Sequence, residues 1–183
     1  QGTVSATPLQ LAVMASRIAS GREVRPRIVR FRGDLELPTP KAARIDIPDE
    51  FLQLARAGMN AVVNEPGGTA VRSAFDNKEW KLAGKTGTSQ VYRITNEERA
   101  RGLTKPEDLP WHRRDHALFV CFAPYEAPRY ACAVVVEHGI GGARVAGPKA
   151  KEIMTAVMTK DPARLKAMSP GALAQNANSA REG

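Results

Sequence analysis

A lysine and two threonines lie close together in Gly84-Lys85-Thr86-Gly87-Thr88, and these residue types suit the binding of a carboxylate substrate. The Lys85 ammonium and the threonine hydroxyls can hold a carboxylate through charge-assisted hydrogen bonds. A backbone N–H of the same strand can stabilise the oxyanion that forms when a substrate carbonyl is attacked. Gly87 lacks a side chain, so a peptide can lie beside the strand there. The segment therefore predicts a site for an extended peptide undergoing acyl transfer.

Two other kinds of site fit the sequence less well. Gly84-Lys85-Thr86 matches the end of a phosphate-binding P-loop, but that motif needs a glycine where Glu79 stands. No strand is predicted before the segment and no helix directly after it, so a phosphate would meet no helix N-terminus. His112 and His116 have a spacing known from zinc sites, but no glutamate follows the first histidine. We therefore predict no metal and no cofactor.

Helices are predicted on both sides of the motif in the sequence. Thr7-Pro8-Leu9-Gln10 forms a capping box, and apolar residues at helical spacing follow it as far as Ser20. A second helix is expected from Pro48 until just before Pro66, and a third begins at Pro148. Thr69 is expected to cap a short helix that runs through Phe75. Residues 22–47 are predicted as strand and loop.

Strands are predicted at 80–91, 118–123 and 130–137, the last two forming an antiparallel hairpin. Residues 93–114 are predicted as a long charged loop, and Gly139, Gly141 and Gly142 as a flexible turn. Residues 175–183 are small and polar, and we expect them to be disordered. The order of the elements predicts an α+β fold, an antiparallel sheet flanked by helices.

Composition excludes several classes of protein. Apolar residues make up 43% and charged residues 25%, which excludes wholesale disorder, and no apolar run approaches the roughly 18 residues of a membrane span. The net charge of +8 suits an anionic partner. Aromatic residues make up only 5% and no nucleic-acid motif is present, so we predict no nucleic-acid partner. A basic module that binds another anionic polymer remains the alternative function.

Several segments, in this order along the chain, resemble the class B penicillin-binding proteins, which are D,D-transpeptidases that cross-link peptidoglycan. Phe122-Ala123-Pro124-Tyr125, Val136-Glu137-His138-Gly139 and the long loop look most like the elongation-type branch, penicillin-binding protein 2. The division-type branch is the nearest alternative. The segments are Gln1-Gly2, Ala6-Thr7-Pro8-Leu9-Gln10-Leu11-Ala12, Gly67-Gly68-Thr69-Ala70, Gly84-Lys85-Thr86-Gly87-Thr88-Ser89-Gln90, Asp115-His116-Ala117-Leu118-Phe119 and Phe122-Ala123-Pro124-Tyr125.

The resemblance implies the transpeptidase fold shared with serine β-lactamases, an acyl-enzyme mechanism, and inhibition by β-lactams. It implies that Lys85 and Thr86 bind the substrate carboxylate and orient a serine, that Gly87 clears the strand, and that Thr88 offers its N–H to the oxyanion and its hydroxyl to the carboxylate. The implied partners are peptidoglycan stem peptides, β-lactam antibiotics, the remainder of the domain, and elongation-complex membrane proteins including a glycosyltransferase. The implied location is the bacterial inner membrane, with this domain in the periplasm.

The chain departs from the family pattern at the nucleophile. No serine is followed by lysine three residues later or by asparagine two residues later, so both the Ser-x-x-Lys and Ser-x-Asn motifs are absent. Ser89 has no base near it in the sequence. We therefore expect residues 1–160 to be the C-terminal part of a transpeptidase domain, followed by a flexible tail at 161–183. Such a piece of a longer polypeptide would be inactive alone and would lack at least the N-terminal strand of the sheet.

Three structural expectations follow from the strand pattern. Alternation places Lys85 and Gly87 on one face of the strand and the threonines on the other, so a shared site requires an edge strand beside an open cleft. The loop 93–114 buries little and should be mobile. Cys121 and Cys132 are equally far from the hairpin turn and should face each other. We expect free thiols there, with a disulfide as the alternative.

Overall fold

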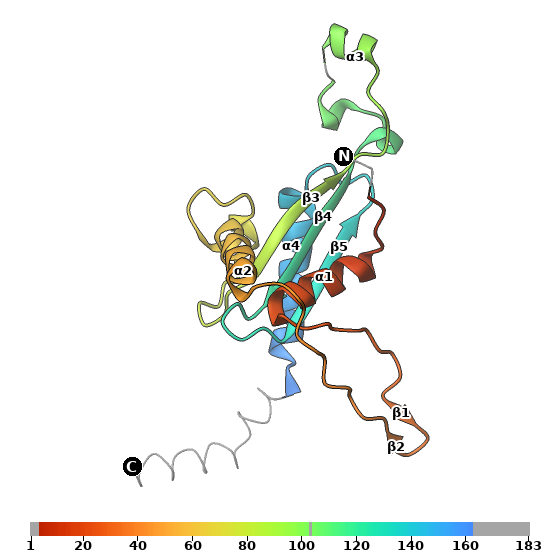
Figure 1. Ribbon diagram of the computed structural model, residues 1–183. Coiled ribbons are helices and arrows are strands. Elements are labelled where there is room, and N and C mark those ends of the chain that lie inside the picture. Colours follow the sequence, from red (N-terminus) through yellow and green to blue (C-terminus); the bar gives the residue numbers. More distant parts are fainter. Residues whose placement is uncertain (1–3, 103, 163–183) are drawn as a thin grey trace.

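The computed structural model describes residues 4–102 and 104–162 and shows a three-stranded main sheet with helices on both faces (Figure 1). No helix in these ranges is both long and apolar enough to cross a membrane. The helices and strands are α1 (Pro8–Ser20), β1 (Phe31–Arg32), β2 (Leu35–Glu36), α2 (Asp49–Asn64), β3 (Ala83–Ser89), α3 (Asn96–Arg101), β4 (His116–Ala123), β5 (Tyr130–Val136) and α4 (Gly147–Thr159).

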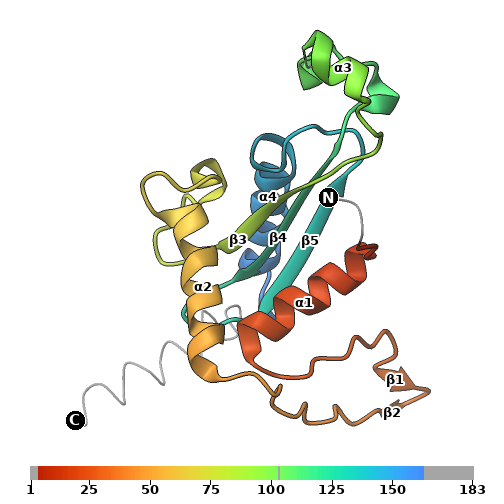
Figure 2. The same cartoon turned by 45° about the horizontal axis from the view of Figure 1, so that its top comes forward.

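The main sheet has the order β3-β4-β5, and both pairings are antiparallel. On one face, Phe119 of β4 packs against Ala150 and Met154 of α4. On the other face, Phe122 packs with Ala19 of α1 and with Met59, which belongs to α2. Figure 2 shows α1 crossing the sheet in front of β5 while α4 runs behind it. The predicted α+β fold is confirmed, and the hairpin of β4 and β5 forms where the sequence predicted it.

The helix ends follow the signals in the sequence in most places. The Thr7 side chain and the Gln10 side chain cap the start of α1 reciprocally, and Gly21 ends it with a left-handed φ of 65°. Asp49 and Glu50 lie in the first turn of α2, where their negative charges interact favourably with the helix dipole and stabilise the helix. The expected cap at Thr69 is wrong: a 3₁₀ turn covers only Val71–Ser73, and no side chain caps it.

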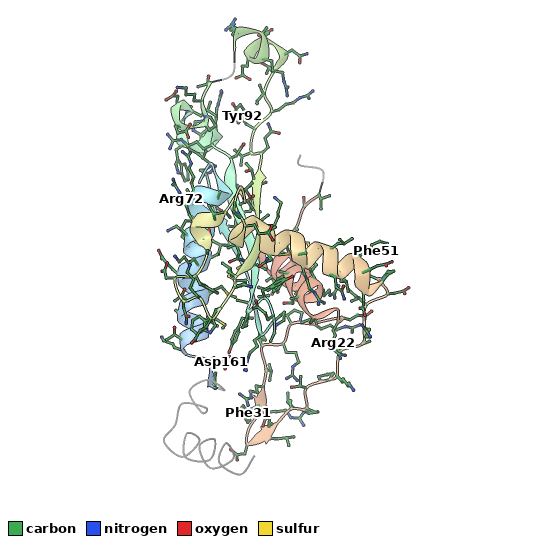
Figure 3. The ribbon with its side chains drawn as sticks, turned by 90° about the vertical axis from the view of Figure 1, so that its left-hand side faces the viewer. Arg22, Phe31, Phe51, Arg72, Tyr92 and Asp161 are labelled. Carbon is green, nitrogen blue, oxygen red and sulfur yellow. The ribbon has the colours of Figure 1, made fainter. Side chains whose placement is uncertain are left out.

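Residues 22–47 form an arm that extends away from the sheet (Figure 1). Only the two-residue strands β1 and β2 are regular, and Arg30 forms an ion pair with Glu36 across them. Phe31 on this arm and Phe51 at the start of α2 stand away from the sheet in Figure 3 and are 51% and 56% exposed. The arm therefore contributes little to the core.

The loop between β3 and β4 is more regular than predicted. It contains α3, capped reciprocally by Thr95 and Glu98, and two 3₁₀ turns. This capping box pairs a threonine with a glutamate three residues later, so the sequence carried the signal. Glu107 also forms an ion pair with Arg144, which ties the loop to the segment before α4. The expected mobility of the loop stays a prediction.

The turn after β5 does not use its glycines as expected. The left-handed residues are His138 and Ile140, with φ of 54° and 67°, whereas Gly139, Gly141 and Gly142 have other conformations. A Cβ at Gly142 would lie 2.4 Å from the carbonyl oxygen of Leu118. Gly142 is therefore needed for close backbone contact, and the flexibility expected for this turn stays a prediction.

The C-terminal end of the described chain is held by an ion pair. Asp161 is 4% exposed, and its carboxylate lies 3.0 Å from Nε of Arg129, which follows the β4–β5 turn. The folded part thus includes Asp161. Residues 175–183, predicted to be disordered, and most of the predicted tail lie outside the described residues.

Cys121 and Cys132 are directly opposed in the β4–β5 register, which confirms the predicted pairing, and both are free. Cys121 is buried and Cys132 is partly exposed. The hydrogen bond from Cys121 lowers the pKa of Cys132 to about 7, and the same contact together with burial raises the pKa of Cys121. Cys132 is therefore the thiol that carries negative charge near neutral pH.

We predict that iodoacetamide alkylates Cys132 in the folded protein at a rate that rises through about pH 7, while Cys121 reacts only after unfolding. The thiolate is the nucleophile, so the rate should level off above that pH. Mass spectrometry of the alkylated peptides measures both sites. In Cys121→Ala the hydrogen-bond donor is lost and the midpoint should move to higher pH; an unchanged midpoint would contradict the assigned cause.

Candidate active-site strand

Strand β3 carries the motif at an edge of the sheet. Among the described residues β3 pairs only with β4, so its other edge has no strand partner, which confirms the predicted edge strand. The strand begins at the buried residues Ala83 and Gly84 and becomes exposed at Lys85. Asn64 of α2 donates a hydrogen bond of 2.9 Å from Nδ2 to the carbonyl oxygen of Leu82, and this bond fixes the start of the strand. The motif is thus anchored in the core at one end and open to solvent at the other.

The Lys85 side chain turns along the open edge toward Thr86. Its Nζ lies 2.9 Å from the carbonyl oxygen of Thr86 and 3.4 Å from the Thr86 hydroxyl. The ammonium and a threonine hydroxyl therefore meet although strand alternation places their Cβ atoms on opposite faces. No carboxylate in the described part of the chain forms an ion pair with Lys85, so its charge is available to an anion.

The backbone of the motif presents alternate N–H groups to the open edge. An added Cβ at Gly142 would lie close to Gly87 N and O and to Leu118 O, so these groups gather between β3 and β4. In an extended strand the N–H and C=O groups of successive residues point to opposite sides. The peptide groups of Thr86 and Thr88 therefore point outward, in agreement with the bond from Lys85 to the Thr86 carbonyl.

The two glycines of the motif differ in what surrounds them. A Cβ on Gly84 would lie 2.4 Å from the Phe119 ring, so packing requires a glycine there. A Cβ on Gly87 would meet only the Cβ of Leu118, at 3.3 Å. Packing therefore gives only a weak reason for glycine at position 87. The absence of a side chain there leaves the strand surface free for a ligand.

The described residues bring the four predicted binding residues together but add no nucleophile to them. Ser89 is exposed at the end of β3, and its hydroxyl forms no hydrogen bond with a side chain of the described residues. His116 Nδ1 accepts a hydrogen bond from the backbone N–H of His138 at 2.9 Å. Within residues 4–102 and 104–162 no three His, Cys, Asp or Glu side chains are placed to hold a metal ion. The sequence did not predict that Gly142 lies next to Gly87 of the motif, because no local sequence pattern indicates a contact between residues so far apart in the chain.

Comparison with known proteins identifies the class to which this arrangement belongs. The family model described as the penicillin binding protein transpeptidase domain matches residues 1–155. The chain therefore belongs to the penicillin-binding protein transpeptidase family, as its motifs suggested.

Relatives of the elongation type are similar over most of the chain. The peptidoglycan D,D-transpeptidase MrdA of Haemophilus influenzae is 31% identical over 167 residues, 84% of this chain and 24% of that protein. Penicillin-binding protein 2 of Pseudomonas aeruginosa, in complex with WCK 5153, has a TM-score of 0.69 and 32% identity over 88% of this chain and 32% of that one. Penicillin-binding protein 2 of Helicobacter pylori, in complex with MreC, has a TM-score of 0.68 and 31% identity over 88% and 26%.

We predict that Gly84→Ala lowers the free energy of unfolding by about 1–3 kcal/mol, because the new methyl group overpacks against Phe119. Gly87→Ala should cost less than about 1 kcal/mol, since only Leu118 must shift slightly. Urea denaturation of both variants measures the difference. Equal losses of stability would show that Gly87 is a packing residue as well.

Proposed function

We propose that this chain supplies the substrate-binding strand of an elongation-type peptidoglycan D,D-transpeptidase. The observation that carries the proposal is the open edge of β3, where the ammonium of Lys85 lies beside Thr86 and no carboxylate of the described chain neutralises it. The family and the similarity to MrdA support the reaction class. Because the chain spans only 24% of the MrdA relative, the activity of the whole protein is part of the proposal.

The residues of β3 fit the binding of a stem peptide that ends in D-Ala-D-Ala. Lys85 and the hydroxyls of Thr86 and Thr88 would hold the terminal carboxylate. The peptide would lie antiparallel to β3, with Gly87 leaving room for it and the outward Thr88 N–H donating to the oxyanion. Lys85 and Thr86 would also orient a serine of the middle motif.

The nucleophilic serine would come from the remainder of the domain, facing β3 across a cleft. Its hydroxyl would attack the carbonyl of the penultimate residue, lose its proton to a neighbouring base, and release the terminal D-alanine. The acyl-enzyme would then pass the peptide to the amine of a second stem peptide. A β-lactam would follow the first step and remain attached, because its leaving group stays in the same molecule.

Partners and location follow from the same branch of the family. The complex of a related penicillin-binding protein 2 with MreC supports a protein partner of that kind, and the complex of another with WCK 5153 supports a small-molecule ligand. The family resemblance extends the proposal to β-lactams and to membrane proteins of the elongation complex, including a glycosyltransferase. The parent enzyme would be anchored in the inner membrane with this domain in the periplasm. The similarity to MrdA favours this branch over a division-type enzyme.

The test joins this chain to the serine-bearing part of its domain and measures acylation by a fluorescent penicillin. We predict that Lys85→Ala lowers the second-order acylation rate constant about 10–100-fold, because a charged hydrogen bond to the substrate carboxylate is lost. Lys81→Ala is the matched control, since Lys81 lies four residues earlier and forms an ion pair with Glu126 instead. It should be acylated at the rate of the unaltered enzyme.

Three results would count against all or part of the proposal. An unaltered enzyme that is never acylated would contradict the reaction class. Salt-sensitive binding to an anionic polymer in its place would favour the basic binding module. Equal acylation of Lys85→Ala and the unaltered enzyme would instead keep the class and remove Lys85 from the site.

A further inference from the structure

The start of β4 and the turn after β5 form a hydrogen-bonded cluster beside the motif. His116 is the first residue of β4 and Asp115 directly precedes it, and His116 is directly opposite Ser89 in the β3–β4 register. The turn contains His138 and Ile140, both in the left-handed region. A β-branched residue with this φ is an outlier that surrounding contacts must hold in place. The turn therefore depends on its neighbours.

Two hydrogen bonds supply that support, one to His116 and one to Asp115. His116 Nδ1 accepts from the His138 N–H at 2.9 Å, and the carbonyl of Asp115 accepts from the Ile140 N–H at 2.9 Å. The Asp115 carboxylate accepts from the Val91 N–H at 3.4 Å, just beyond β3. The same two residues thus hold the strained turn and the segment that leaves the motif strand.

The ring of His138 completes the cluster. Its Nδ1 lies 2.8 Å from the carbonyl oxygen of Arg114, so it donates and carries the proton. Its ring lies 4.1 Å from Trp111 and 4.8 Å from His116 between centroids. His116 must keep its own Nδ1 free of a proton, because a protonated nitrogen cannot accept from the His138 N–H.

The turn delivers Gly142 to the back of the motif. The chain passes from Ile140 to Gly142. Gly142 lies so close to the peptide groups of Gly87 and Leu118 that an added Cβ would overlap them. A shift of the turn would move Gly142 and release the Gly87 peptide, and the Thr88 N–H follows in the chain. A continuous series of contacts therefore links the His116 ring to the motif: His116 bonds to the turn, and Gly142 after the turn packs on the Gly87 peptide groups.

We propose that His116 is a positioning residue for acylation, acting through Nδ1 as a hydrogen-bond acceptor that fixes the turn and thereby the peptide groups of Gly87 and Thr88. The inference rests on the proposed transpeptidase function for its rate effect. The structural effect, an ordered turn and strand end, stands independently of that function. The role needs the acceptor atom at the Nδ1 position and not the imidazole as a base.

The test compares His116→Asn with His116→Gln in the enzyme that contains the serine-bearing part. The asparagine oxygen can occupy the position of Nδ1, whereas the longer glutamine side chain places its oxygen nearer the position of Nε2. His112→Asn is the control, because His112 is an exposed histidine of the same segment. Acylation by a fluorescent penicillin is measured together with backbone amide exchange in residues 86–90 and 137–142.

We expect His116→Gln to lower the acylation rate constant about 10–100-fold, because the peptide groups of Gly87 and Thr88 are no longer held in position. Backbone amide exchange in both segments should become faster. His116→Asn should stay within about threefold of the unaltered enzyme and keep slow exchange, like the His112→Asn control. Equal behaviour of the two His116 variants, whether both are normal or both impaired, would overturn the proposal. So would rescue by glutamine alone.

The exchange measurement separates this inference from the proposed function. If the unaltered enzyme is not acylated, the proposed function fails, while faster exchange in His116→Gln alone still supports the positioning of β3 by His116. If acylation is normal in all variants and exchange is unchanged, the proposed function stands and the inference is overturned.

Discussion

The pairing of β3 with β4 on one side only is the constraint on which the rest of the structure depends. An edge strand must keep its register with half of the usual hydrogen bonds, because only one of its edges pairs with another strand. The buried start of β3, with Gly84 against the Phe119 ring, fixes that register from the core. The outer edge then carries a charged residue, Lys85, which also discourages pairing with another strand.

Support for the open strand comes from both ends and from behind. Asn64 binds the carbonyl before the strand, and Asp115 binds the N–H of Val91 after it. Gly142 packs against the peptide groups on the α4 side of the sheet. Side chains on the outer edge are therefore free for binding, since none of them is needed to hold the strand. This division separates the residues that set geometry from those that would meet substrate.

Local signals predicted most of the fold. The capping box at Thr7 and the pattern of the β4–β5 hairpin gave the helix and the strand register correctly, because neighbouring residues determine both. Helix α3 was missed although its Thr95 capping box is also local, since the length and charge of the loop outweighed it. The left-handed His138 and Ile140 had no local signal, because distant contacts with Asp115 and His116 stabilise them.

The candidate site was predicted in composition but not in geometry. Sequence spacing placed Lys85 and Thr86 on opposite faces, and only the open edge lets the ammonium reach the hydroxyl. The edge position itself followed from the family motif and was confirmed. The role of the cluster around His116 required the structure, because His138 and His116 are far apart in the sequence and meet through the turn.

Three glycines near the motif show why a short sequence pattern does not define a site. Gly84 is required by the Phe119 ring and Gly142 by the peptide groups it covers, whereas Gly87 has only a light contact with Leu118. A P-loop uses its glycines to gather backbone N–H groups around a phosphate at a helix N-terminus. Here β3 stays extended to Ser89 and its outward N–H groups are spread along an edge. Such an edge suits an extended peptide with a terminal carboxylate, and it does not suit a compact phosphate.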